Sequence, residues 1–148
     1  NILDLGFGVS QIFPILVEGL FAPNGSTILL EQPEIHLNPK IQAALGDFFA
    51  FVTKHDNKQF IIETHSEHLI SRIRKLIVSG IIDKEDVAVH YCNATSNGST
   101  ISQLPIDDYG SFENWPEGFF EEEIKEATEI SRAVFQKRNT QNSVEVKP

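Results

Sequence analysis

Two short apolar runs of the chain each end in a cluster of polar side chains. Thr27–Leu30 is followed by Glu31, Gln32 and Glu34, and Gln59–Ile62 is followed by Glu63, Thr64 and His65. An acidic pair after an apolar strand suits a magnesium–nucleotide site, because this hard cation prefers oxygen ligands and the attacking water must be oriented near the γ-phosphate. A histidine after the next strand can add a donor to that phosphate. The two clusters therefore predict nucleotide chemistry.

The elements that must position these residues alternate between strand and helix. Each apolar run is short and bounded by turn residues, which is typical of a parallel strand covered on both faces. Strand, helix, strand and helix in this order predict a parallel sheet with crossover helices, and ligands bind beyond the carboxyl ends of such strands. We therefore expect the two polar clusters to meet at one edge of an α/β fold.

Three helices are expected around these strands. The first should start just after Gly8, because Pro14 is tolerated only within about the first turn of a helix. Asn38 and Pro39 predict the N-cap and first residue of a helix of about four turns, and Ser66 predicts the cap of another helix that stops near Gly80. The buried stripes are expected at Ile41, Ala44, Leu45, Phe48, Phe49 and Val52 in one helix and at Leu69, Ile70, Ile73, Leu76 and Ile77 in the other.

The rest of the chain has a different character. Val87–Tyr91 and Thr100–Leu104 predict a β-hairpin around the polar loop Asn93–Ser99. An acidic amphipathic helix is expected over Phe119–Lys137, and Trp115 in the preceding loop is expected to form a docking core with Phe119 and Phe120. The expected domains are residues 1–82 for the α/β part, 83–137 for the hairpin and helix, and 138–148 for a flexible tail.

Composition narrows the class of protein. The 148 residues carry a net charge of −9, from 12 Lys plus Arg against 21 Asp plus Glu, which disfavours a basic surface for nucleic acid on this segment. No apolar run approaches the roughly 20 residues that span a bilayer, so we expect a soluble, cytoplasmic protein without a membrane partner. The absence of Met and the start at Asn1 suggest a piece of a longer protein, for which nucleic acid remains a possible partner.

Four segments resemble one family of ATPases. Thr27–Pro39 (TILLEQPEIHLNP) is similar to the Walker B and D-loop stretch of the ABC-type heads in recombination, structural-maintenance and overcoming-lysogenization-defect ATPases. Gln59–Ile70 (QFIIETHSEHLI) resembles their switch-histidine segment, and Leu5–Gln11 (LGFGVSQ) occupies the place of their signature turn. Ile106–Glu121 resembles the end of bacterial AAA-family members that finish in a short domain of unknown function. The resemblance implies the C-terminal half of a P-loop ATPase.

The resemblance also implies roles for the residues that follow the first strand. Glu31 takes the Walker B position, where it would hold magnesium directly or through water. Gln32 takes the place of the usual catalytic glutamate, and an amide can orient water but cannot act as a carboxylate base. Slow hydrolysis is implied, or rescue by Glu34 two residues later. His65 corresponds to the switch histidine.

Other matched residues would face the nucleotide of a second head. Gly8, Ser10 and Gln11 lie in the signature turn, and Gly6 stands where its usual serine would be. His36 and Asn38 lie in the D-loop, which normally crosses a dimer interface. The implied ligands are ATP and magnesium, and the implied partners are a second ATPase head and the N-terminal part of the same protein. No Gly is followed by Lys, so no Gly-Lys-Ser/Thr phosphate loop exists in this chain.

Two alternatives stay open. Because Gln32 replaces a carboxylate, the segment could serve a non-catalytic head that clamps ATP, or a module for protein interaction. The acidic residues and His36, His65 and His68 could instead serve a metal-dependent nuclease or hydrolase, although they lack the His-Glu-x-x-His spacing. ATP binding with slow hydrolysis through dimerising heads is the function that the sequence favours.

Overall fold

The computed structural model describes residues 7–96, 98–113, 129 and 132. The chain divides into two compact units, Asn1–Glu113 and Asn114–Pro148, and the features below belong to the first. Gly6 and the segment predicted as a C-terminal helix and tail, with Trp115, Phe119 and Phe120, lie outside the described residues. The domain boundaries expected at residues 82 and 137 stay a prediction.

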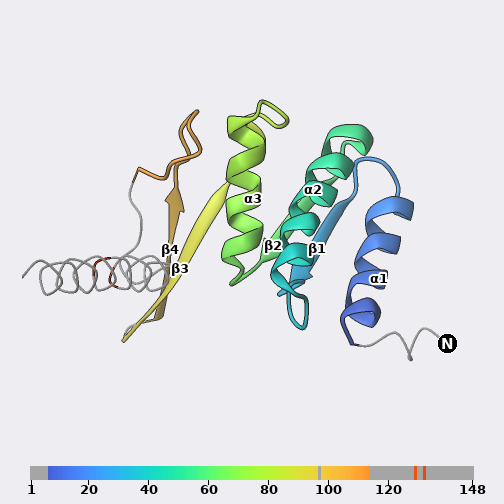
Figure 1. Cartoon of the computed structure of the whole chain (residues 1–148), viewed down its shortest axis with the longest axis horizontal. Coiled ribbons are helices and arrows are strands. Elements are labelled where there is room, and N and C mark those ends of the chain that lie inside the picture. The colour runs from blue at the N-terminus through green and yellow to red at the C-terminus, as the bar shows by residue number, and fades with distance from the viewer. Residues whose placement is uncertain (1–6, 97, 114–128, 130–131, 133–148) are drawn as a thin grey trace, which may run out of the picture. The chain divides into compact units, whose positions relative to one another are not determined.

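The described elements follow the order expected from the sequence (Figure 1). They are the helix α1 (Phe7–Phe21), the strand β1 (Thr27–Glu31), the helix α2 (Pro39–Asp56), the strand β2 (Gln59–Glu63), the helix α3 (Glu67–Val78), the 3-10 helix η2 (Lys84–Asp86) and the strands β3 (Val89–Thr95) and β4 (Gly98–Leu104). β1 and β2 pair in parallel, and β3 and β4 form an antiparallel hairpin. The predicted α/β class with a following hairpin is confirmed.

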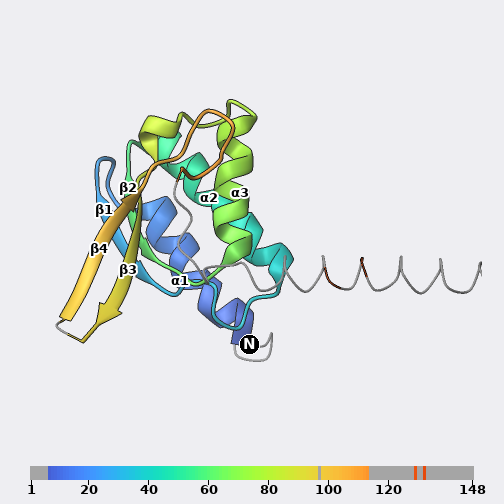
Figure 2. The same ribbon diagram turned by 90° about the vertical axis from the view of Figure 1, so that its left-hand side faces the viewer.

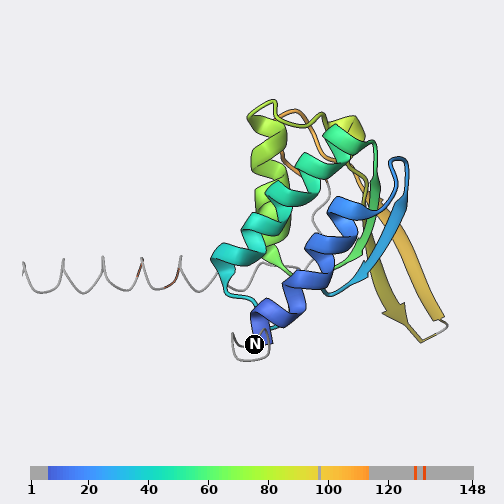
Figure 3. The ribbon, with the colours of Figure 1, turned by 90° about the vertical axis from the view of Figure 1, so that its right-hand side faces the viewer.

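The three helices α1 to α3 cover one face of the β1–β2 pair (Figures 2 and 3). Leu30, Phe60 and Ile62 point to that side. They pack against a core of buried side chains from the three helices and from the turn after β1. These are Ile15, Leu37, Leu45, Phe49 and Leu69. On the opposite face, Leu29 and Ile61 are 72% and 53% exposed. The prediction that both strands are covered on both faces is therefore wrong for the described residues, because a continuous apolar run does not reveal how many layers cover it.

The helix α1 begins at Phe7, earlier than predicted, and Pro14 lies inside it beyond the first turn. Packing of Ile15 in the core holds the helix although Pro14 lacks an amide donor. At the other end, the buried Lys58 ammonium donates to the carbonyls of Gly19 and Leu20, at 2.7 and 3.3 Å, and pairs with Asp56. A cation at this place suits the negative end of the helix dipole.

The helices α2 and α3 begin at the predicted caps. Asn38 accepts a hydrogen bond from the Ile41 amide, and Ser66 accepts one from the Leu69 amide, both at 3.0 Å. Of the residues expected in the α2 stripe, Ala44 is exposed. Gly46 is buried instead, because its missing side chain lets Arg72 of α3 approach to 3.0 Å from where a Cβ would stand. α2 also has 18 residues, about five turns rather than four.

The hairpin strands are longer than predicted, since Asn93–Thr95 and Gly98–Ser99 are paired rather than looped. Their polar side chains fit because most of both strands is exposed, so neither face requires apolar residues. After β4, the loop of residues 105–113 closes with an Ile106–Phe112 bridge and packs on α3. The Arg74 side chain of α3 donates to the Gly110 carbonyl and lies over the Phe112 ring.

Candidate functional site

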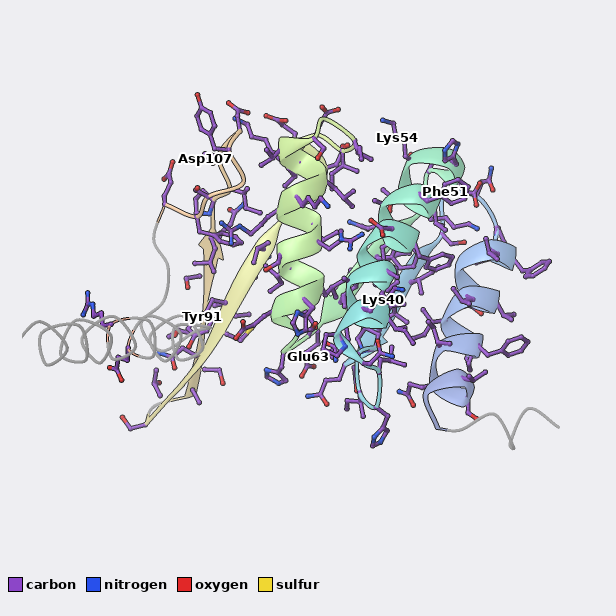
Figure 4. All side chains as sticks on the ribbon, viewed as in Figure 1. Lys40, Phe51, Lys54, Glu63, Tyr91 and Asp107 are labelled. Atoms are coloured by element: carbon purple, nitrogen blue, oxygen red, sulfur yellow. The ribbon has the colours of Figure 1, made fainter. Side chains whose placement is uncertain are left out.

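The carboxyl ends of β1 and β2 bring the two polar clusters together, as predicted. Glu31 and Glu63 are register partners at the last paired position, and both are exposed. The backbone amide of Gln32 donates to the Glu63 carbonyl at 2.8 Å, which extends the parallel ladder by one hydrogen bond. Figure 4 labels Glu63 at the end of the structure where α3 begins, and Asp107 at the opposite end of α3. The site thus lies at one edge of the parallel pair.

The chain reverses direction immediately after β1, in the segment that we call the Gln32–Asn38 turn. Gln32 has φ 46° and His36 has φ 63°, both in the left-handed region that few residues other than glycine adopt. Backbone hydrogen bonds from Ile35 to Gln32 and from Leu37 to Glu34, at 3.2 and 3.0 Å, hold the turn. Non-glycine residues in this region persist where surrounding contacts impose them, which is common at functional sites.

Glu34 is buried in this turn, with an exposed fraction of 7%. Its Oε1 atom accepts a hydrogen bond from the backbone amide of His65 at 2.6 Å. Its Oε2 atom is also buried and has no hydrogen-bond partner among the described residues. Glu34 is therefore a buried link between the turn after β1 and His65, the last residue of the second polar cluster, and not a solvated loop acid.

A second link between the same segments runs through Gln42, which the sequence analysis missed. Its Nε2 atom donates to the Leu37 carbonyl at 2.8 Å, and its Oε1 atom accepts from the Ser66 hydroxyl at 2.7 Å. The available signal was its position, because Gln42 precedes Leu45 by three residues and Phe49 by seven and so shares the buried side of α2. A polar side chain on that side requires a partner.

The start of α1 lies against the Gln32–Asn38 turn. A Cβ on Gly8 would stand 3.3 Å from the His36 carbonyl oxygen and 3.4 Å from the Leu37 side chain, so a larger residue would push the two segments apart. Ser10 is half-buried and Gln11 is exposed on the first turns of α1. The segment with the signature-like turn and the segment with the D-loop-like turn therefore adjoin within one chain.

The remaining predicted residues lie around this edge. His36 and His65 are exposed, and the Asn38 side chain caps α2 through its Oδ1 atom. Among the described residues, no group of three or more His, Cys, Asp or Glu side chains is arranged to hold a metal ion. The nuclease or metal-hydrolase alternative thus receives no support from this part of the chain.

A magnesium ion that binds together with a nucleotide needs fewer protein ligands than a metal ion held by the protein alone. In such sites the ion is usually held by one or two carboxylates, while the phosphates and water supply its other oxygens. The exposed Glu31 carboxylate, with Glu63 as its register partner, fits that donor set. The residues present therefore suit a magnesium–nucleotide complex better than a metal held by the protein alone.

None of the described helices has the length and apolar character of a membrane-spanning segment. The single cysteine, Cys92, is exposed on β3 without a disulfide partner. Neither feature adds a further site to the edge of β1 and β2.

Two family models match parts of the chain. Residues 1–71 match the family described as an AAA domain, putative AbiEii toxin, Type IV TA system. Residues 82–130 match the family described as a protein of unknown function, DUF3696. No curated protein matches the chain.

One solved structure, described by the words "Structural biochemistry of ATP-driven dimerization and DNA stimulated activation of SMC ATPases", is similar to the chain. Its TM-score is 0.47 at 14% sequence identity, over 66% of this chain and 50% of that one. The chain therefore spans about half the length of that structure. The two family matches confirm the resemblance found in the sequence: residues 1–71 are similar to an AAA-type ATPase domain, and a DUF3696 region follows them.

Proposed function

We propose that this chain supplies one part of an ATP·magnesium site in an AAA-type ATPase that hydrolyses ATP slowly. The observation that carries the proposal is the in-register pairing of β1 with β2, which sets Glu31 and Gln32 beside the Glu63–His65 segment. Two hydrogen bonds hold these segments together. The backbone amide of Gln32 donates to the Glu63 carbonyl, and the backbone amide of His65 donates to the Glu34 carboxylate. The match of residues 1–71 to an AAA domain supports the same reading.

Each strand-end residue has a role in this proposal. Glu31 holds magnesium, directly or through a water molecule, because its carboxylate is exposed at the strand end. The side-chain carboxamide of Gln32 orients the attacking water, and His65 donates to the γ-phosphate. Magnesium bound with ATP would neutralise charge that develops on the phosphates.

A second head would complete the site. Gly6, Gly8, Ser10 and Gln11, with His36 and Asn38, are proposed to face the nucleotide that the partner head holds. The close approach of Gly8 to the His36 carbonyl supports this idea, since it joins the two segments into one surface. ATP binding would then drive dimerisation of the heads. A phosphate loop must come from outside these 148 residues, because they contain no Gly-Lys pair.

A second candidate is a head that clamps ATP without turnover. One specific observation favours it: neither position that could supply a general base offers an exposed carboxylate. Position 32 is an amide, and the Glu34 carboxylate is buried and accepts from the His65 backbone. Hydrolysis without a base depends on water orientation alone, which predicts a low rate.

The test is ATP binding and turnover in the full-length protein with Glu31→Ala, with Glu85→Ala as the control at an exposed acid outside the site. We expect Glu31→Ala to abolish hydrolysis and Glu85→Ala to leave it unchanged. Equal turnover in the two variants would refute the ATPase proposal. A wild-type protein that binds ATP and dimerises but releases no phosphate would instead establish the clamp.

A further inference from the structure

Two independent hydrogen-bonded links join the Gln32–Asn38 turn to the start of α3. The first is the bond from the His65 amide to Glu34, which involves one residue on each side. The second passes through Gln42, whose carboxamide contacts the Leu37 carbonyl on one side and the Ser66 hydroxyl on the other. Ser66 follows His65 directly and caps α3, so both links end at the same place.

We propose that Gln42 is a positioning residue for His65, which couples the location of that histidine to the Gln32–Asn38 turn. The inference rests on the proposed function, in which His65 approaches the γ-phosphate and the turn faces a second head. Through Gln42, a displacement of the Leu37 backbone pulls on the Ser66 hydroxyl and shifts the first turn of α3. His65, which lies between the Glu34 and Ser66 contacts, moves with it.

The carboxamide suits this task because it offers a donor and an acceptor at once. The donor end meets the carbonyls of Leu37 and, at 3.5 Å, Glu34, while the acceptor end meets Ser66. A carboxylate at position 42 could still accept from Ser66 but would set an anionic oxygen against the Leu37 carbonyl. Gln42→Glu therefore breaks the bond to the turn alone, whereas Gln42→Leu removes both bonds at similar volume.

The chain provides a matched control where β1 and β2 begin, at the opposite end of these strands from the Gln32–Asn38 turn. Gln59 accepts from the Thr27 hydroxyl at 3.2 Å, which is also a glutamine–hydroxyl bond that joins β2 to β1. Gln59→Leu removes that bond far along the strands from His65. A change specific to Gln42 variants is thus separable from the general loss of one hydrogen bond between these segments.

The first measurement is residue-resolved hydrogen exchange in the full-length protein without nucleotide. One lost hydrogen bond of ordinary strength corresponds to about tenfold faster exchange where it governs local opening. We expect that increase at the His65 and Leu69 amides in Gln42→Leu and Gln42→Glu, with the β1 amides unchanged. Gln59→Leu should leave His65 unaffected. Unchanged exchange at His65, or an equal increase throughout the protein, would overturn the positioning role.

The second measurement is ATP turnover. Gln42→Leu should lower kcat about tenfold with little change in KM, because His65 contacts the phosphate in the reacting complex. Ser66→Thr keeps the hydroxyl and should retain most activity. Faster exchange without a loss of kcat would reduce Gln42 to a structural residue and refute the inference. If Glu31→Ala proves silent while exchange at His65 still responds to Gln42, the ATPase proposal alone fails.

Discussion

The Glu34 carboxylate accepts a hydrogen bond from the backbone amide of His65 across 31 residues of sequence, at 2.6 Å. The acceptor is a buried carboxyl oxygen, where little water competes for the hydrogen bond. His65, which belongs to the polar cluster after β2, is therefore held by Glu34 in the turn after β1. Variants of Glu34 can therefore distinguish two roles for this residue, that of a general base and that of a group that only positions His65.

Replacing Glu34 by Gln keeps an acceptor oxygen at nearly the same volume but removes the carboxylate. If Glu34 positions His65, Glu34→Gln should retain most ATP hydrolysis in the full-length protein. Glu34→Ala should reduce hydrolysis and lower the free energy of unfolding by about 1–3 kcal/mol, because the His65 amide loses its acceptor. Steady-state kinetics and urea denaturation measure the two effects.

A different result is expected for the same two variants if Glu34 takes part in the chemistry. If Glu34 acts as the general base, Glu34→Gln and Glu34→Ala should both be nearly as inactive as Glu31→Ala. His65→Ala should reduce hydrolysis strongly in either case, since it removes the proposed phosphate donor.

Giving position 32 a carboxylate tests the proposed role of the Gln32 amide. Gln32→Glu should leave hydrolysis unchanged or make it faster, since a carboxylate can both orient and deprotonate water. Gln32→Gly is the control for the strained backbone at this position. Glycine adopts φ 46° freely, so the substitution removes the side chain without disturbing the turn. Phosphate release at saturating ATP is the measurement. Loss of turnover in Gln32→Glu with ATP binding intact would make the amide itself essential.

The 148-residue chain by itself should bind ATP weakly. No Gly-Lys-Ser/Thr phosphate loop occurs in it, so the amide cradle and lysine that hold the β and γ phosphates must come from elsewhere. Calorimetric titration with ATP and magnesium should detect no tight site. Micromolar affinity would contradict the proposal that the phosphate loop lies outside these residues.

The loop of residues 105–113 should depend on Arg74 more than on Lys84. Arg74 donates to the Gly110 carbonyl and lies 5.6 Å from the centre of the Phe112 ring, and Arg74→Ala should destabilise the fold by about 1–2 kcal/mol. Lys84→Ala is the control, because its pair with Asp108 is exposed to solvent and such pairs contribute little. Thermal denaturation and limited proteolysis within the loop should both respond clearly to Arg74→Ala and only slightly to Lys84→Ala.

The Lys84–Asp108 pair also has a defined pH dependence. The hydrogen bond to Asp108 raises the pKa of Lys84 above its usual 10.5. The small contribution of the pair is therefore present below pH 10.5 and is lost as the pH rises through the raised pKa. Between pH 6 and 9, wild type and Lys84→Ala should differ by a constant amount in melting temperature, and a slope across that range would contradict this assignment.

Short-range chemistry accounts for what the sequence predicted correctly. The caps at Asn38 and Ser66 depend on neighbours three residues away, and the apolar runs identify β1 and β2 with their parallel pairing. Contacts between distant segments account for what it missed. The burial of Glu34 and the bridge through Gln42 exist only because β2 carries His65 and Ser66 back to the turn, which no local pattern encodes.

Two errors of helix prediction have related causes. Helical spacing places Ala44 on the apolar stripe of α2 and leaves Gly46 outside it, and only the position of α3 determines that Gly46 is the buried one. Pro14 was expected within the first turn because its local energetic penalty is large, yet the packing of neighbouring Ile15 outweighs that penalty.

Leu29 and Ile61 are register partners on the uncovered face of the β1–β2 pair. Purified without a covering layer, this chain would present adjacent large apolar side chains beside strands whose outer edges can accept another strand. Such surfaces favour aggregation, which the net charge of −9 opposes through mutual repulsion that weakens as salt is added. The chain should therefore lose colloidal stability at high ionic strength, and Leu29→Lys should restore its solubility while leaving the opposite, helix-covered face intact.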